Sequence, residues 1–273
     1  MTNILIAITA YFIDRIFGEF KFFRHPVKYI GDMITWFEEN YYQDSFIRGV
    51  YLVIFIVGSI GFISLLIEEY ISYFFSLLNI VTSGFIASMF ISHKLLYDSV
   101  TKVLTSDYKN EALAKLLRED TKDMSENDIY RITIETYAKR LNTDFIAPIF
   151  YLIFFGLPGI ITYKAIRTLD SMVGSKTQKY EQYGKAAALL DDLASYIPAR
   201  ITAVLIMLVS SQKDVFSFYE NAKKHESPNT GHPLTAMAMA LGIKLGAGKI
   251  RFGEGREEIT QEDVRAALKL GRI

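Results

Sequence analysis

Charged residues are distributed unevenly along the chain, and the gaps between them predict two membrane-spanning helices. No Asp, Glu, Lys or Arg occurs in 49–67, a stretch of 19 residues, or in 70–92, a stretch of 23. At about 1.5 Å per residue, each stretch can cross a hydrocarbon core of ~30 Å as a helix. Only Glu68 and Glu69 separate the two, which predicts a transmembrane hairpin that turns at these glutamates. The alternative is a pair of buried helices in a soluble protein, but such helices rarely lack charge over this length.

Two further apolar segments are interrupted or short. Segment 145–163 has no charged residue, but two prolines and two glycines lie between Pro148 and Gly159, and both residue types disfavour a regular helix. Segment 197–212 contains Arg200 and, after it, only 12 uncharged residues, or roughly 18 Å of helix. Either both segments cross the membrane, or both enter it and return to the same side.

Counting the positive charges favours the second topology. Lys and Arg number four in 17–48, none between the two long spans, nine in 93–144, five in 164–199 and eleven from residue 200 onward. Loops rich in Lys and Arg stay on the cytoplasmic side. We therefore expect the Glu68–Glu69 turn to face outward. If segments 145–163 and 197–212 both return, every Lys and Arg lies on the cytoplasmic side.

The polar segments predict further helices. Ser125-Glu-Asn-Asp128 and Thr260-Gln-Glu-Asp263 each place a hydroxyl three residues before a carboxylate, as in a capping box at a helix start. No alternation typical of strands and no internal repeat is present. We therefore expect an all-α, polytopic integral membrane protein with transmembrane and re-entrant helices. A single membrane-embedded domain, 1–273, would include a cytoplasmic helical segment at 94–144 and a cytoplasmic C-terminal segment at 213–273.

The amino-acid composition argues against several classes of protein and of site. The 273 residues include 30 Lys or Arg and 30 Asp or Glu, so the formal net charge is zero. This balance argues against nucleic acid as a partner, because nucleic-acid-binding domains carry a basic excess. The absence of cysteine excludes disulfides, thiolate metal sites and a cysteine nucleophile. The four histidines lack a metal-binding spacing. Gly246-Ala-Gly-Lys249 has a misplaced first glycine and lacks the final Ser or Thr of a phosphate loop.

Polar residues gather beside the two interrupted segments. Lys164, Arg167 and Ser171 are spaced i, i+3 and i+7, so on a helix they share a face that suits phosphate oxygens. Asp170 lies next to this face, and Asp191 and Asp192 precede the second segment. Magnesium takes one or two carboxylates together with phosphate oxygens, so these aspartates are candidate magnesium ligands. The alternative is a solvated rim of charges at the membrane surface.

A third polar cluster is the loop from His225 to Pro233. Prolines and a glycine predict a tight turn, and an apolar helix follows from Leu234. The N-terminus of such a helix can bind an anion. The alternative is an ordinary turn at the start of a helix.

Short motifs rich in polar residues, glycine and proline are spread over nearly the whole chain. The most distinctive is Thr168-Leu-Asp170-Ser171-Met-Val-Gly174. The others, in chain order, are Asp14…Gly18-Glu19, Arg24-His25-Pro26-Val27, Arg118-Glu-Asp120-Thr121, Ile134-Glu135-Thr136, Ala147-Pro148, Tyr163-Lys164-Ala165, Leu190-Asp191-Asp192, Tyr196-Ile-Pro198-Ala-Arg200 and Ser227-Pro228-Asn229-Thr-Gly231. These motifs, in this order, resemble those of the CobD/CbiB family, the adenosylcobinamide-phosphate synthases of cobalamin biosynthesis, and the first is the most specific of them.

One motif departs from the family pattern. The family usually has Ala-Glu-Asn-x-x-Asp-Gly after Val-Glu-Thr, whereas this chain has Lys139 and Arg140 at the acid and amide positions. Asp144 stands one residue after the position of the family's aspartate. The change either alters catalysis at this motif or reflects a different amino-alcohol substrate.

The resemblance implies an ATP-dependent ligase at the inner (cytoplasmic) membrane. It would join adenosylcobyric acid to aminopropanol phosphate, or to a related compound such as ethanolamine phosphate, and would need magnesium. The implied catalytic residues are Glu135, Lys164, Asp170, Asp192 and His225. Those for substrate or phosphate are His25, Arg167, Ser171, Arg200, Ser227 and Asn229, and those for magnesium are Asp170, Asp191 and Asp192. The site would face the cytoplasm, in contact with membrane lipid and accessible to other corrinoid-pathway enzymes.

Two non-enzymatic alternatives remain from the sequence. Polar residues beside broken helices also occur in membrane carriers, although only two spans here are uninterrupted. A non-catalytic membrane scaffold for corrinoid enzymes would tolerate Lys164→Ala or Asp170→Ala, whereas an enzyme would lose most of its turnover.

Overall fold

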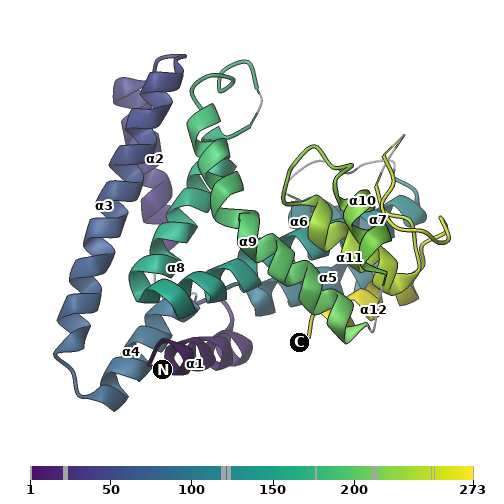
Figure 1. The fold of residues 1–273 in the computed structure, drawn as a ribbon, viewed down its shortest axis with the longest axis horizontal. Coiled ribbons are helices and arrows are strands. Elements are labelled where there is room, and N and C mark those ends of the chain that lie inside the picture. The colour runs from purple at the N-terminus through teal and green to yellow at the C-terminus, as the bar shows by residue number, and fades with distance from the viewer. Residues whose placement is uncertain are drawn as a thin grey trace. The chain divides into compact units, whose positions relative to one another are not determined.

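The computed structural model describes residues 2–20, 24–117, 121, 124–175, 177–210, 214–246, 248 and 250–272. These residues form helices and no β-strand (Figure 1). The sole β-type pairings among them are isolated bridges, which join Ile243 to Arg256 and Leu245 to Phe252. The predicted all-α class is confirmed. Two earlier motifs, Arg118–Asp120 and Lys249, lie outside the described residues.

The chain divides into two compact units. That they belong to a single membrane-embedded domain stays a prediction. Unit 1 comprises 1–92 and 147–195, and unit 2 comprises 93–146 and 196–273. The helices of unit 1 are α1 (Thr2–Phe17), α2 (Pro26–Tyr41), α3 (Phe46–Ser72), α4 (Ser76–Ser88), α8 (Ala147–Val173) and the first part of α9 (Lys185–Val209). Those of unit 2 are α5 (His93–Thr105), α6 (Lys109–Leu117), α7 (Glu126–Leu141), a π-helix (Asn142–Ile146), the rest of α9, α10 (Val215–Ala222), α11 (Gly231–Leu241) and α12 (Gln261–Leu270).

Four helical runs in the described chain are long and apolar enough to cross a membrane. They are Phe46–Ser72, Ser76–Thr105, Glu126–Val173 and Lys185–Val209. The most apolar is α3, where large side chains such as Ile54, Phe62 and Leu66 are exposed, as expected of a surface that faces lipid. Together, the helices and their apolar surfaces are those of a polytopic membrane protein.

The predicted turn at Glu68 and Glu69 is wrong. Helix α3 continues through both glutamates to Ser72, and the chain turns at 73–75. The expected second span, 70–92, is therefore divided between the end of α3 and the 13-residue α4. Two adjacent glutamates did not end the helix because each has good helix propensity, and Glu68 has a partner in α8.

Helix α8 contains the predicted interruption, which lies at Gly156. This residue has φ 66° and ψ −157°, so two helical halves meet at a corner, visible in Figure 1. Next to this break, the N–H of Leu157 donates to Glu68 Oε1 on α3 at 3.2 Å. The following residue, Pro158, has no N–H to donate. The rings of Tyr151 and Tyr163 stack with centroids 4.9 Å apart. Twelve residues of straight helix would separate them by about 18 Å, so the two halves turn towards each other.

Close packing fixes α1 against α4 inside unit 1. Any Cβ at Gly84 would come within 2.6 Å of the Thr9 side chain, so only glycine allows the two helices to approach this closely. Exposed apolar residues, among them Ile8 and Phe12, occupy the rest of α1. At 16 residues, α1 is too short to cross the hydrocarbon core as a straight helix.

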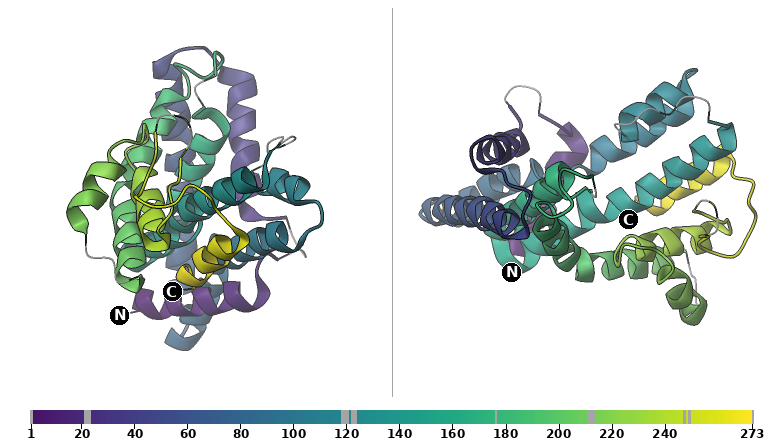
Figure 2. Two further views of the ribbon diagram at one scale, coloured as in Figure 1. Left: turned by 90° about the vertical axis from the view of Figure 1, so that its right-hand side faces the viewer. Right: turned by 90° about the horizontal axis from the view of Figure 1, so that it is seen from above.

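Both helix starts predicted from capping boxes in unit 2 are confirmed. Ser125 Oγ accepts a hydrogen bond from Asp128 N at 3.2 Å at the start of α7. Thr260 and Asp263 form the full reciprocal box at the start of α12, in which Thr260 N donates to Asp263 Oδ2 at 2.7 Å, and Gly271 is the C-cap of this helix. Helix α12 packs alongside α7 and α5 (Figure 2).

Candidate functional site

Helix α8 brings a cation and two carboxylates together in unit 1. Arg167 Nη1 donates to Asp170 Oδ2, one turn along α8, and to Asp191 Oδ2 on α9 at 3.1 Å. All three side chains are largely buried, with exposed fractions between 12% and 23%. Asp192, next along α9, lies within electrostatic reach of Asp170 and Arg167. The two helices therefore assemble the predicted Arg167, Asp170, Asp191 and Asp192.

Gly174 explains the glycine at the end of the most specific motif. Its N–H donates to Asp170 O at 2.8 Å, which closes the end of α8. Any Cβ at this position would collide with the Asp170 carboxylate and come within 2.7 Å of its main-chain oxygen. The absence of a side chain at Gly174 therefore leaves the space that the Asp170 carboxylate occupies. This role was not predicted from the sequence. It could have been inferred from the position of the glycine, four residues after Asp170 at the end of a helix.

A second polar group in unit 1 surrounds His25 and Lys164. His25 caps the N-terminus of α2, where its Nδ1 accepts from Val27 N at 3.2 Å. Burial lowers the pKa of His25, the charge of Glu19 opposes this effect, and the nearby charge of Lys164 adds to it. Lys164 is itself buried in α8. The N-terminal motif and the middle of α8 thus meet, which the sequence did not show.

The predicted cationic face is only partly formed. Lys164 is buried, Arg167 is paired, and Ser171 is exposed near the end of α8. Among the described residues, Ser171 makes no side-chain hydrogen bond. The charged members of the face thus lie in the interior of unit 1 and its serine lies at the surface.

The aspartates fit a magnesium–nucleotide complex better than a bare metal ion. In the described part of the chain, no three His, Asp or Glu side chains form a metal-binding group. Magnesium commonly relies on one or two carboxylates and completes its shell with phosphate oxygens and water. Asp170, Asp191 and Asp192 offer that donor set, and Arg167 holds two of them in place.

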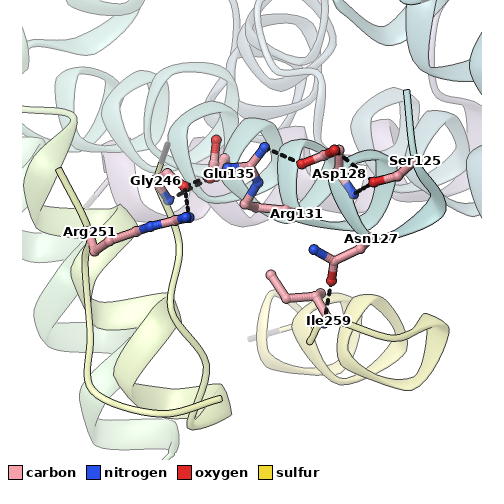
Figure 3. A network of polar contacts seen from close by, with 8 residues as sticks. All are labelled: Ser125, Asn127, Asp128, Arg131, Glu135, Gly246, Arg251 and Ile259. Atoms are coloured by element: carbon pink, nitrogen blue, oxygen red, sulfur yellow. Dashed lines mark hydrogen bonds and ion pairs between the residues drawn. The ribbon is translucent and has the colours of Figure 1, made fainter. Parts of the chain in front are cut away.

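In unit 2, Glu135 contacts the main chain of the loop at Gly246. Its Oε1 accepts from Gly246 N at 2.7 Å, while Arg131 and Arg251 each donate to Gly246 O at 2.6 Å (Figure 3). Arg131 also pairs with Asp128. Arg131 and Glu135 lie four residues apart on α7, yet each bonds the main chain at Gly246 rather than the other side chain. Glu135 is therefore part of a network that anchors the loop at Gly246 to α7.

The predicted loop from His225 forms a compact turn before α11. His225 Nδ1 accepts from Ser227 N at 2.9 Å, and Ser227 Oγ accepts from the N–H groups of Asn229 and Thr230 at 3.4 Å each. Burial, and secondarily the charge of Lys139, lower the pKa of His225. The side chains of His225 and Ser227 thus fix the conformation of the loop by accepting hydrogen bonds from its main chain.

Arg200 lies against this loop within unit 2. Its guanidinium group stacks over the Tyr196 ring at 3.3 Å and donates to Tyr196 O at 2.6 Å and Asn229 Oδ1 at 3.4 Å. The altered motif lies on α7, where Arg140 pairs with Asp144 at 2.8 Å. Asp144 thus serves as the partner of the arginine that stands at the family's amide position.

The predicted residues therefore form two groups. His25, Lys164, Arg167, Asp170, Asp191 and Asp192 gather in unit 1. Arg200, His225, Ser227 and Asn229 gather in unit 2, where Glu135 belongs to the Gly246 network. A single pocket that joins the two groups remains a prediction.

Comparison with known proteins decides the family. The family model described as CobD/Cbib protein matches residues 7–271. The chain belongs to the CobD/CbiB family. It is 33% identical to the probable cobalamin biosynthesis protein CobD of Methanocaldococcus jannaschii over 92% of this chain and 90% of the relative. The corresponding protein of Pyrococcus furiosus is 32% identical, over 96% of this chain and 91% of its own length. A CobD of Clostridium perfringens is also 32% identical, over 97% and 90%. No solved structure matches.

Proposed function

We propose that the protein acts in cobalamin biosynthesis as an adenosylcobinamide-phosphate synthase. It would form an amide between a propionate of adenosylcobyric acid and the amine of aminopropanol phosphate or a related amino-alcohol phosphate. Membership of the CobD/CbiB family supports the pathway. The observation that carries the reaction type is the largely buried cluster of Arg167, Asp170 and Asp191 around the most specific family motif, with the buried Lys164 on the same helix.

Amide formation from a carboxylate requires that one oxygen of the acid become a leaving group. ATP with magnesium would supply a phosphoryl group to that oxygen and leave ADP. The amine nitrogen would then attack the carbonyl carbon, displace phosphate and lose a proton. Catalysis of such a transfer depends on positioning and on compensating the phosphoryl charge.

Different residues of the chain would carry out the separate steps of this reaction. Lys164 and Arg167 would stabilise the negative charge on the transferred group, and Asp170, Asp191 and Asp192 would hold magnesium. His25 and Ser171 lie on the same unit as candidate substrate contacts. In unit 2, Glu135 and His225 are the candidate acceptors for the amine proton, and Arg200, Ser227 and Asn229 the candidate contacts of the amino-alcohol phosphate.

The location follows from the reaction. ATP and corrinoids are cytoplasmic, so the site would open to the cytoplasm from the cytoplasmic membrane. The excess of Lys and Arg after residue 92 supports that orientation. Lipid would surround the exposed apolar faces of α1, α3 and α4. Association with other corrinoid enzymes would follow naturally at this surface.

The test uses purified protein in detergent with adenosylcobyric acid, ATP and magnesium. Aminopropanol phosphate and ethanolamine phosphate are supplied separately. We expect the mass of the corresponding amide product, stoichiometric formation of ADP, and a preference for one amine. Absence of product from every combination, with protein that is folded and monodisperse, would reject the proposal.

A further inference from the structure

The first turns of α11 contain two buried polar groups without a partner in the described chain. His232 is 6% exposed and Thr235 is fully buried, and neither His232 Nδ1 nor Thr235 Oγ1 has a hydrogen-bond partner. Buried polar groups in native proteins are nearly always bonded, either to protein or to a bound molecule. These two atoms therefore indicate that something polar is bound here in the working protein.

Both groups belong to one helix N-terminus. His232 and Thr235 are three residues apart, so they share a face of α11. Helical side chains lean towards the N-terminus. There the helix dipole places partial positive charge. Main-chain donors are few, because His232 N donates to Asn229 O at 3.2 Å and Pro233 has no N–H. The donors that this end of α11 offers to an anion are therefore mainly side chains.

Arg200 adds a full positive charge to the same place. It contacts Asn229, two residues before α11, and its charge reaches His232. In the part of the chain that the structure describes, Arg200 has no carboxylate partner, whereas Arg140 pairs with Asp144 and Arg167 with Asp170. Burial and the charge of Arg200 lower the pKa of His232 to about 4. The imidazole is therefore neutral at pH 7, and one of its nitrogens is a donor.

We propose that Arg200, His232 and Thr235 bind the phosphate of the amino-alcohol substrate at the N-terminus of α11. This inference rests on the proposed function and adds His232 and Thr235 to it. A phosphate monoester accepts bidentate hydrogen bonds from a guanidinium group, and further bonds from a hydroxyl and an imidazole N–H. Ser227 Oγ instead accepts hydrogen bonds from main-chain N–H groups of its own loop. We therefore place the phosphate at the first turns of α11 rather than at Ser227.

The test measures equilibrium binding to the full-length protein in detergent at fixed salt. The ligands are aminopropanol phosphate, inorganic phosphate, unphosphorylated aminopropanol and ATP. For Thr235→Val we expect affinity for aminopropanol phosphate to fall about tenfold, since one hydrogen bond to a charged group is lost. Arg200→Gln should lower it by about tenfold or more and weaken its dependence on salt. Binding of aminopropanol and ATP should change in neither variant.

Thermal unfolding separates a ligand site from a structural role. Thr235→Val removes a hydroxyl without a partner, so the ligand-free variant should unfold at the same temperature as the wild type or higher. The matched control is Thr133→Val, a buried threonine whose hydroxyl bonds Ile129 O at 2.6 Å. It should keep full affinity for aminopropanol phosphate.

Wild-type affinity in both Thr235→Val and Arg200→Gln would overturn the inference and leave bound water as the partner of these groups. The two proposals fail separately. If the amide product forms but Thr235→Val binds normally, the phosphate site is wrong and the function stands. If aminopropanol phosphate binds as described and no amide forms, the function is wrong and the site stands.

Discussion

The two units of this membrane protein arrange one half-buried arginine each in opposite ways. In unit 1, Arg167 is bound by two carboxylates, so its positive charge is compensated before any ligand arrives. In unit 2, Arg200 has no carboxylate partner in the described chain and lies near polar groups that lack hydrogen bonds. A paired cluster can bind a metal–nucleotide complex, because the arginine can then pair with the phosphate oxygens while the carboxylates bind the metal ion. A cation without a carboxylate partner can bind an anion without first breaking an ion pair.

This comparison assigns different parts of one reaction to the two units. Unit 1 would activate the acid, and unit 2 would bind the phosphate of the amine. Arg200 keeps a positive charge that no described carboxylate compensates, beside two buried polar groups that lack hydrogen bonds, so it is the more informative of the two. The experiments below test the contrast from the largest expected effect to the smallest.

The largest effect should follow loss of a carboxylate in unit 1. Asp170→Asn removes a proposed magnesium ligand and one partner of Arg167, and we expect turnover to fall by about 10²-fold or more. The measurement is the rate of amide formation at saturating substrates. The control is Asp32→Asn, which alters an exposed ion pair with Arg24 and should leave turnover within about twofold of the wild type. Normal turnover in Asp170→Asn would exclude this cluster from catalysis.

A smaller loss should follow Gly174→Ala. The new methyl group would displace the Asp170 carboxylate, and misplacement of a catalytic group by about 1 Å costs roughly 10 to 100-fold in rate. Gly58→Ala in α3 is the matched control, because a Cβ there meets nothing within 4 Å. That control should retain turnover and gain slightly in stability. Equal behaviour of the two variants would contradict the positioning role of Gly174.

The corner in α8 gives a prediction about stability. Glu68→Ala leaves the N–H of Leu157 without its partner, and we expect the free energy of unfolding to fall by about 1–3 kcal/mol. Glu68→Gln retains an acceptor and should recover most of the loss. Thermal unfolding in detergent measures both, with the exposed neighbour Glu69→Ala as control. A loss as large in Glu69→Ala as in Glu68→Ala would refute the role of Glu68 at the corner.

The smallest effect is a pH dependence caused by His232. The unfolded state takes up a proton near pH 6.5, whereas the folded state does so only near pH 4. Between these values the unfolded state binds more protons, so stability falls as the pH is lowered from 6.5 towards 4. His232→Gln should reduce this slope, and the lowered pKa values of His25 and His225 leave a remaining slope of the same sign. An unchanged slope in His232→Gln would contradict the assignment.

Local patterns predicted much of the helical architecture. The long uncharged stretch before Glu68, the capping boxes at Ser125 and Thr260 and the break at Gly156 each depend on neighbouring residues, so they can be recognised in the sequence. The hairpin turn was misplaced because Glu68 bonds to a residue 89 positions away. Such a partner cannot be inferred from spacing.

The candidate site was predictable in composition but not in arrangement. Helical spacing identified Arg167, and family motifs identified Asp170 and Asp191, and the three do come together. The sequence did not reveal that Arg167 joins the aspartates, or that Ser227 and Glu135 are occupied by main-chain N–H groups. His232 and Thr235 were missed because an unpaired buried atom is visible only once the chain is folded.

The division of labour between the units is tested most directly by trapping the activated acid. Protein in detergent is mixed with adenosylcobyric acid, ATP, magnesium and hydroxylamine, which captures the activated acid as a hydroxamate without needing the phosphate of the natural amine. The account predicts that Arg200→Gln still forms hydroxamate but makes little amide at low aminopropanol phosphate, whereas Asp170→Asn forms neither. Loss of hydroxamate in Arg200→Gln to the same extent as in Asp170→Asn would contradict it.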